Sequence, residues 1–189
     1  SRPLPFQVAA KDYPVQKLKI ANQKMVTPDP EQLARINAER DRQISIRSQF
    51  REVPVTRSDL ALPADGRLSS RFGLRRVFNG EPRAPHTGLD VAVPTGTPIR
   101  APADGVVTLV DDFYFNGKTV FVDHGQSFVS MVCHLDRAGV EAGQTVRRGE
   151  VLGHSGSSGR ATGPHLHWSV YLNGAAVDPA LFIGPRPAR

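Results

Sequence analysis

The sequence of 189 residues has one cysteine, Cys133, so an internal disulfide bond is excluded and redox chemistry becomes a poor candidate. Tryptophan and tyrosine are scarce, with one and three copies, and basic residues gather only in doublets such as Arg75-Arg76 and Arg147-Arg148. A nucleic-acid groove needs a concentrated basic face and aromatic stacking platforms. We therefore expect no nucleic-acid partner, although the net charge of +6 would suit another polyanion.

Long hydrophobic runs are also absent. The longest aliphatic stretch beside a strand signal covers residues 106–110, whereas a membrane-spanning helix needs about 20 apolar residues. We therefore expect no membrane span. The chain begins Ser1-Arg2-Pro3, without Met and without a basic-then-apolar leader, so we expect a secretion signal to be absent or already removed.

The first third of the chain differs in texture from the rest, and we expect two parts, residues 1–60 and residues 61–189. Loose alternation of apolar residues over positions 6–26 predicts one or two short strands. Asp29-Pro30 then signals the start of a helix over about residues 30–48, because Asp caps a first turn and Pro fits within it. This part is interpreted as a linker or packing appendage, or as the end of a missing upstream domain.

Residues 61–189 contain short β-prone runs separated by Gly, Pro and Asp, and no helix-length periodic segment. Turn signals such as Asn116-Gly117 and Asn173-Gly174 bound these runs. Strands at this spacing predict a mainly β domain, either an antiparallel sandwich or a curled, partly closed antiparallel sheet. The clearest predicted strands are 106–110, 119–123, 128–134 and 168–172.

All six histidines follow residue 85, and several lie in segments that could supply metal ligands. His165 and His167 precede a β-prone run, where positions two apart project from the same face, so both are expected to face one site. Zinc takes imidazole and carboxylate ligands, and catalytic sites typically use three protein ligands with one open position. His86 and Asp90 could complete such a set.

A shared ion would impose a geometric condition on His86 and Asp90. A fully extended span of four residues holds its Cα atoms roughly 13 Å apart, too far for joint ligation. The chain must therefore bend between them, and Gly88 is the residue that could permit the bend.

The remaining candidates are expected to be structural. Cys133 neighbours His134 on a predicted strand, so its side chain points to the opposite face and belongs in the core. His124 and His154 lie in Gly-flanked turns, where hydrogen-bonded histidines are common. None of these three side chains is expected to ligate a metal.

Several separated motifs, in order over about residues 65–180, resemble the lysostaphin-like (LytM-type) zinc metallopeptidases, which are peptidoglycan endopeptidases. A set of ordered motifs is far more specific than any one of them. The motifs are Ser70-Arg71-Phe72-Gly73, His86-Thr87-Gly88-Leu89-Asp90, Gly96-Thr97-Pro98, Ala103-Asp104-Gly105-Val106-Val107, Val122-Asp123-His124-Gly125, His134-Leu135, Val146-Arg147-Arg148-Gly149, Gly153-His154-Ser155-Gly156, Thr162-Gly163-Pro164 and His165-Leu166-His167-Trp168.

The resemblance implies a role for each matching position. His86, Asp90 and His167 would ligate one Zn²⁺ ion, and His134 and His165 would stand beside it as the catalytic pair. Which of the two accepts a proton stays open at this point. The implied fold is a compact, curled antiparallel β-sheet whose groove accepts a peptide.

The resemblance also implies a function: hydrolysis of peptide cross-links in bacterial peptidoglycan by a monomer exported to the cell envelope, periplasmic or extracellular. The expected bond joins D-alanine to a diamino acid, with glycine bridges as the alternative. A second interpretation is a noncatalytic peptidoglycan-binding or amidase-activating module, which would be expected to lack one of the five site residues. A third, a zinc-stabilised DNA-binding domain, would need a closed four-ligand site and a basic face.

Two departures from the family pattern bear on specificity. The aromatic after the His-Leu-His motif is Trp168, and the following position, commonly acidic in the family, is Ser169. Neither change removes a ligand, so substrate preference is affected more than metal binding. Residues 1–60 lie outside the match. They are expected to act as a packing strut, and the alternative is that they block the groove.

Overall fold

The computed structural model describes residues 7–55 and 58–184, and these are mainly β, as the sequence predicts. Ten strands form one sheet whose main path runs β10-β7-β8-β9-β12-β5-β2, and every pairing in it is antiparallel. The strands are β2 (Arg67–Ser70), β5 (Leu89–Ala92), β6 (Pro98–Arg100), β7 (Gly105–Phe113), β8 (Gly117–Asp123), β9 (Phe128–Ala138), β10 (Thr145–Val146), β11 (Val151–Ser155), β12 (Leu166–Leu172) and β13 (Ala175–Val177).

All four strands predicted most clearly from the sequence are present, as β7, β8, β9 and β12. Their turns follow the expected chemistry. Asn173 and Gly174 have φ angles of 49° and 78°, which join β12 to β13 through a tight hairpin turn of the kind that favours Asn-Gly.

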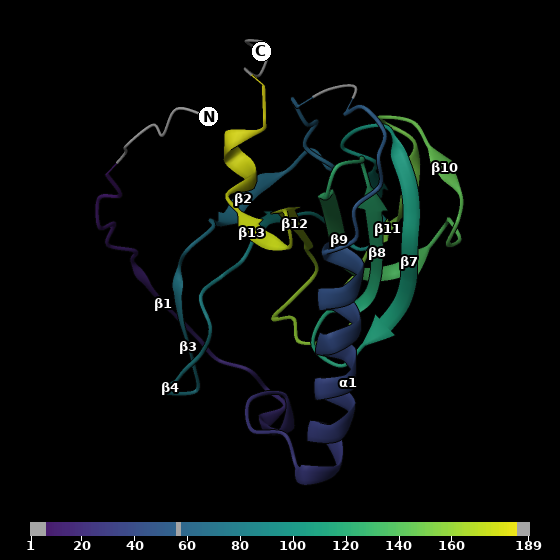
Figure 1. Cartoon of the computed structure of the whole chain (residues 1–189). Coiled ribbons are helices and arrows are strands. Elements are labelled where there is room, and N and C mark those ends of the chain that lie inside the picture. Colours follow the sequence, from purple (N-terminus) through teal and green to yellow (C-terminus); the bar gives the residue numbers. More distant parts are fainter. Residues whose placement is uncertain (1–6, 56–57, 185–189) are drawn as a thin grey trace.

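The N-terminal part crosses the molecule rather than standing apart from it (Figure 1). Strand β1 (Val15–Leu18) pairs in parallel with β3 (Arg75–Phe78), which also pairs with β4 (Glu81–Pro82) in a second, three-stranded sheet. A short 3-10 helix, η1 (Gln23–Met25), then leads into α1 (Pro30–Arg47). One short strand and one helix are therefore confirmed in this part of the chain.

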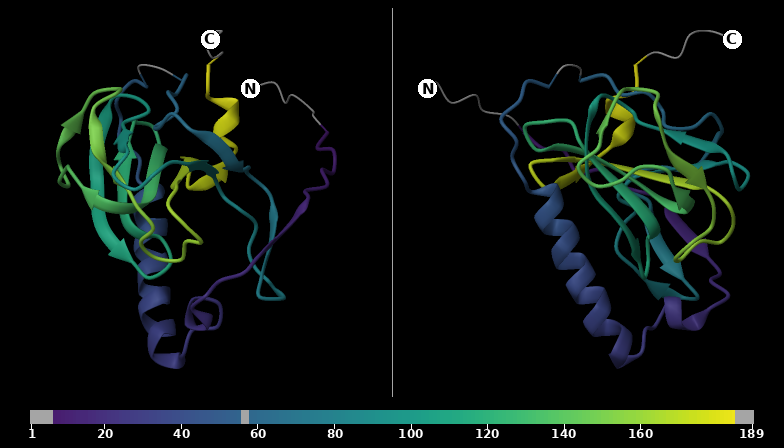
Figure 2. Two further views of the ribbon diagram at one scale, coloured as in Figure 1. Left: turned by 180° about the vertical axis from the view of Figure 1, so that it is seen from behind. Right: turned by 90° about the vertical axis from the view of Figure 1, so that its right-hand side faces the viewer.

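Helix α1 begins where its capping signal predicts. The Asp29 side chain accepts a hydrogen bond from the Gln32 amide at 3.1 Å, and Pro30 occupies the first turn. Ser48 is the C-terminal cap. The helix lies along one side of the main sheet (Figure 2).

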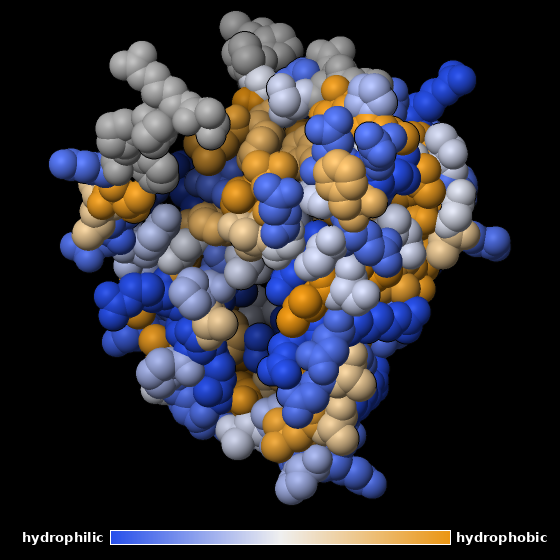
Figure 3. Space-filling view, in the orientation of Figure 1, coloured by the Kyte–Doolittle hydropathy of each residue, from blue (hydrophilic) through white to orange (hydrophobic). Residues whose placement is uncertain are grey.

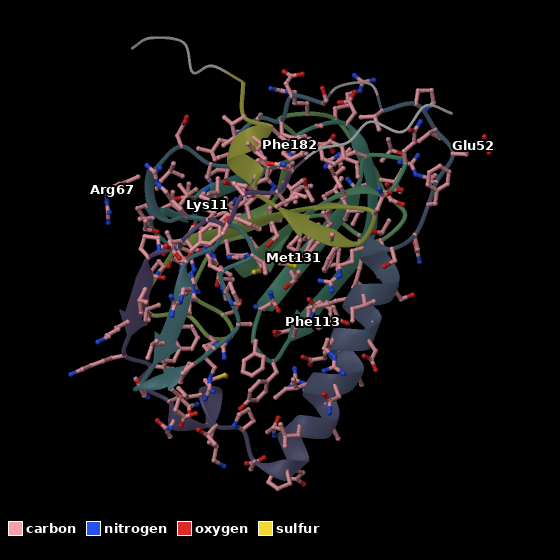
Figure 4. All side chains as sticks on the ribbon, turned by 60° about the vertical axis from the view of Figure 1, so that its left-hand side comes forward. Lys11, Glu52, Arg67, Phe113, Met131 and Phe182 are labelled. Carbon is pink, nitrogen blue, oxygen red and sulfur yellow. The ribbon has the colours of Figure 1, made fainter. Side chains whose placement is uncertain are left out.

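Two layers of apolar side chains lie on opposite faces of this sheet. The larger core includes Trp168, Leu89 and Leu135, and Phe182 packs against it. The smaller layer faces α1, and Met131 and Phe113 are seen there in Figure 4. Its buried members are Leu109, Phe113, Phe121, Val129, Met131, Cys133 and Tyr171, with Ile46 of α1 packed on them.

Cys133 belongs to this smaller layer, as predicted, and is fully buried. Burial raises the pKa of its thiol to about 12, so the side chain stays protonated at neutral pH. Cys133 is therefore a core residue.

Polar contacts also hold α1 to β7 and the turn after it. Arg35 donates to the backbone carbonyl of Asp112 at 3.0 Å, and Glu39 accepts from the amide of Tyr114 at 2.8 Å. Arg42 forms an ion pair with Asp111. None of the helices within residues 7–55 and 58–184 has the length and apolar content of a membrane span.

Candidate metal centre and active site

Three buried side chains converge at the junction of β5 and β12. Asp90 of β5 lies directly opposite His167 of β12 in the strand register. The Asp90 Oδ1 atom is 2.8 Å from His167 Nδ1 and 3.0 Å from His86 Nε2, and the two nitrogens are 3.0 Å apart. The sequence motifs that contain these residues are far apart along the chain, and antiparallel pairing brings them together.

The tautomer of His86 follows from its neighbours. Its Nδ1 atom lies 2.8 Å from the backbone carbonyl oxygen of Arg71, which can only accept, so Nδ1 carries the proton and Nε2 presents a lone pair. On His167, Nε2 lies 2.8 Å from the Ser169 hydroxyl, which can accept its proton and leave the Nδ1 lone pair facing Asp90. Ser169, the departure noted in the sequence, thus contacts a candidate ligand directly.

This arrangement fits a divalent metal ion. Two imidazole lone pairs and a carboxylate oxygen meet at one point, where a cation is the group that satisfies all three. Burial alone would raise the pKa of Asp90, but the neighbouring His167 and His86 outweigh it and hold that pKa far below its usual value. The second oxygen, Asp90 Oδ2, accepts from Arg76 Nη2 at 2.7 Å. Asp90 is therefore a fixed, ionised carboxylate.

Gly88 lies between His86 and Asp90 for a steric reason. A Cβ atom at this position would stand 2.3 Å from the carbonyl oxygen of Trp168 and 2.9 Å from His167 Cε1. The bend therefore passes so close to β12 that no side chain fits, and close approach explains the glycine.

Replacing Gly88 with alanine is expected to destabilise the fold by about 1–3 kcal/mol, the range for overpacking a close contact. The free energy of unfolding in urea measures this effect. Gly184→Ala is the matched control, because a Cβ there would meet nothing within 4 Å. Equal stability of the two variants would contradict the steric explanation.

His134 and His165 lie beside these three residues. Their ring centroids are 4.7 Å apart, and His134 is 6.1 Å from the ring of His167. Each donates its Nδ1 proton to a backbone carbonyl at 2.8 Å, Ser158 for His134 and Gly163 for His165, which leaves both Nε2 atoms unprotonated. Burial, then the neighbouring His165 and His167, lower the pKa of His134 to about 3, so this imidazole is neutral at pH 7.

A β-bulge aims His134 at the site. Cys133 and His134 together stand opposite Thr119 alone, between the pairs Val120–Val132 and Lys118–Leu135. His134 has a φ angle of +61°, a left-handed conformation that is unusual in a strand. The bulge breaks the regular alternation, so Cys133 and Leu135 face opposite layers while His134 points to the cluster.

Two cavities adjoin the histidine cluster, one of about 280 Å³ and one of about 520 Å³. The smaller is walled by β1 and the loop before His165, and the larger by α1 and the segment before His86. A hollow in the face of the molecule appears between these walls in Figure 3. The side chains that line both cavities are Arg76, Phe78, His134 and Arg160.

The structure thus gathers all five residues that the sequence singles out, His86, Asp90, His134, His165 and His167. It keeps His124 apart in a structural position, where Nδ1 is 2.8 Å from the Asp104 carbonyl oxygen and Nε2 is 2.9 Å from the Ser130 hydroxyl. Burial lowers the pKa of His124, so it too is neutral.

Sequence reasoning missed the contribution of the N-terminal part and of two arginines. Residues such as Gln16 and Leu33 wall the cavities although they lie outside every recognised motif. Arg76 and Arg160 follow or precede motifs by one or two positions, and a charged residue beside Gly-rich segments is the signal that could have drawn attention to them.

A sequence model of "Peptidase family M23" matches residues 84–179, which include all five site residues. The chain belongs to peptidase family M23. The expectation from the motifs is therefore confirmed at the level of the family, and the antiparallel β architecture is shared with solved M23 structures.

Named relatives of this M23 chain act on peptidoglycan. It is 37% identical over 135 residues to "Peptidoglycan DD-endopeptidase ShyA" of Vibrio cholerae, which covers 71% of this chain and 30% of that protein. It is 42% identical over 121 residues to "DD-carboxypeptidase/endopeptidase Mpg" of Neisseria meningitidis, covering 64% and 28%. The chain thus spans under a third of the length of these relatives.

Among solved structures, a putative peptidase M23 from Pseudomonas aeruginosa superposes with a TM-score of 0.73 at 52% identity, covering 82% of this chain and 63% of that one. A zinc-containing peptidase from Vibrio cholerae superposes with a TM-score of 0.60 at 31% identity, covering 69% and 40%. The fold around the M23 site is therefore shared with a peptidase that contains zinc.

Proposed function

We propose that this M23 chain is a zinc-dependent endopeptidase that hydrolyses peptide cross-links in peptidoglycan. The observation that carries the proposal is the meeting of three metal-binding lone pairs beside two neutral imidazoles. His86 Nε2, Asp90 Oδ1 and His167 Nδ1 would hold one Zn²⁺ ion. When bound, zinc supplies a Lewis acid that polarises a peptide carbonyl and lowers the pKa of water.

His134 and His165 are proposed as the catalytic pair. An unprotonated Nε2 atom can accept the proton of an attacking water, and the resulting imidazolium can later protonate the leaving amine. Burial holds His134 neutral at pH 7, which favours it as the acceptor. His165 is half-buried at the edge of the smaller cavity, where it is suited to hydrogen-bond the reacting carbonyl oxygen or the leaving group.

The proposed substrate bond joins D-alanine to a diamino acid in the peptide stems. Relatives named DD-endopeptidases, at 37–42% identity, support this choice over a glycine bridge. A noncatalytic binding or amidase-activating module is the second candidate. The presence and convergence of all five site residues favour the enzyme over that module.

The same relatives support a place in the bacterial cell envelope, periplasmic or extracellular, and we propose action as a monomer. Residues 61–189 are proposed as the peptidase unit, because the family match lies entirely within them. Residues 1–60 are proposed as an appendage that packs on the sheet through α1 and lines the cavities through β1. Substrate would then reach the histidines beside this appendage.

Digestion of purified peptidoglycan by the full chain tests this function. We expect cleavage of the diamino-acid type, loss of cleavage on treatment with a chelator, and recovery on addition of zinc, because the three ligands have no other means of binding the ion. Mass spectrometry of the released peptides identifies the bond. Chelator-resistant cleavage would refute the role of zinc, and binding without cleavage would favour the noncatalytic module.

A further inference from the structure

Arg160 is a half-buried arginine in the wall shared by the two cavities. Its guanidinium is stacked against two aromatic rings, 4.1 Å from the centroid of Phe115 and 4.7 Å from that of Phe78. Stacking holds the faces of the planar group and leaves its N–H edge free for hydrogen bonds. Its recorded side-chain hydrogen bond runs from Nη1 to the Met25 carbonyl at 3.1 Å.

Arg160 also differs from the other arginines at the site in its charge balance. Arg76 is paired with Asp90, and Arg83 is paired with Glu81. Among residues 7–55 and 58–184, no carboxylate forms an ion pair with Arg160. Burial and the nearby Arg76 and Arg83 lower its pKa to about 10, so it still carries its charge at neutral pH. A half-buried cation of this kind is costly unless an anion joins it.

We propose that Arg160 binds a carboxylate of the peptide substrate and so determines which cross-links the site accepts. This inference rests on the proposed function and identifies a substrate feature of the same site. The fixed guanidinium edge matches a carboxylate, which can receive two parallel N–H bonds. Because Arg160 lines both cavities together with His134, a carboxylate held there lies within the same groove as the reacting bond.

A structural explanation must be separated from this one. Arg160 also donates to the Met25 carbonyl and so ties the N-terminal part to the cavity wall. Arg83 does the same at the neighbouring residue, since its Nη2 donates to the Val26 carbonyl at 2.7 Å, but it already has Glu81 as a partner. Arg83→Met is therefore the matched control for loss of such a tie.

The experiment compares the zinc-loaded wild type, Arg160→Met, Arg160→Lys and Arg83→Met on synthetic cross-linked peptides. One peptide carries all its carboxylates free, a second has the diamino-acid carboxylate amidated, and a third has the terminal α-carboxylate amidated. We expect Arg160→Met to lower kcat/KM about 10- to 100-fold on the free peptide, chiefly through KM, as for loss of a charge-assisted hydrogen bond. Arg160→Lys keeps the charge and is expected to retain part of the affinity.

The amidated peptides identify the partner. The one whose carboxylate meets Arg160 is cleaved poorly by the wild type and is no longer affected by Arg160→Met, whereas the other behaves like the free peptide. Equal losses on all three peptides, or an equal loss in Arg83→Met, would overturn the inference.

Dissociation constants measured by calorimetry in the slowly reacting His134→Ala background repeat the comparison without turnover. If the wild type cleaves no peptide and no peptidoglycan, the proposed function fails, yet these binding constants still decide the role of Arg160. Cleavage that ignores amidation would instead refute the role of Arg160 and leave the endopeptidase function intact.

Discussion

His134→Ala is expected to lower kcat for cross-link hydrolysis by about 10²- to 10⁴-fold, the usual contribution of a positioned general acid or base, while zinc stays bound. His134 makes no contact with Asp90 or His86 among the recorded hydrogen bonds, and its Nδ1 is held by the Ser158 carbonyl. Removing it therefore deletes a proton acceptor and leaves the three ligand atoms in place. Steady-state kinetics and the zinc content of the purified protein measure the two quantities.

The control for His134 is another histidine outside the cluster. His154→Ala removes an imidazole from β11 and is expected to keep both zinc and hydrolysis per folded molecule. Turnover like that of the wild type in His134→Ala would refute the catalytic role. Loss of zinc from the same variant would assign His134 to metal binding or to the structure of the site.

Asp90→Ala is expected to abolish both zinc binding and hydrolysis. The carboxylate supplies the negative charge of the ligand set, and without it two neutral imidazoles face the positive Arg76 at the same point. Repulsion of a divalent cation and the loss of one of three ligands act in the same direction. Metal analysis after dialysis against zinc is the measurement, followed by peptidoglycan digestion.

Loss of a buried ion pair could lower activity through unfolding, so Asp90 needs a matched control. Asp123 provides one, because it is also a buried carboxylate and its Oδ2 accepts from Arg51 Nε at 2.6 Å. Asp123→Ala is expected to cost stability and to retain zinc at one ion per chain. An Asp90→Ala protein that still held zinc would require a different ligand set.

The five site residues could be predicted from the sequence because ordered motifs carry them, and their meeting follows from simple strand pairing. Asp90 and His167 face each other in neighbouring antiparallel strands, a relation that alternation anticipates once both strands are recognised. Helix α1 was equally predictable, since its start is marked locally by Asp29 and Pro30.

Other features could not be predicted because they depend on contacts between distant segments. The pairing of β1 with β3 joins Val15 to Arg75, and no local pattern specifies that partner. Arg160 was overlooked for a similar reason, since its lack of an acidic partner is a property of the folded surroundings. Gly88 was assigned to a bend, whereas the close approach of Trp168 explains it, and that approach exists only after folding.

The left-handed backbone at His134 bears on how this chain tolerates change over generations. An L-residue with a side chain held at such a φ angle costs roughly 1–2 kcal/mol, which glycine would avoid. Selection for a well-folded chain alone would therefore favour glycine at position 134, and selection for hydrolysis would oppose it. A lineage released from the second pressure would be expected to lose this histidine early and to gain thermal stability as it did so.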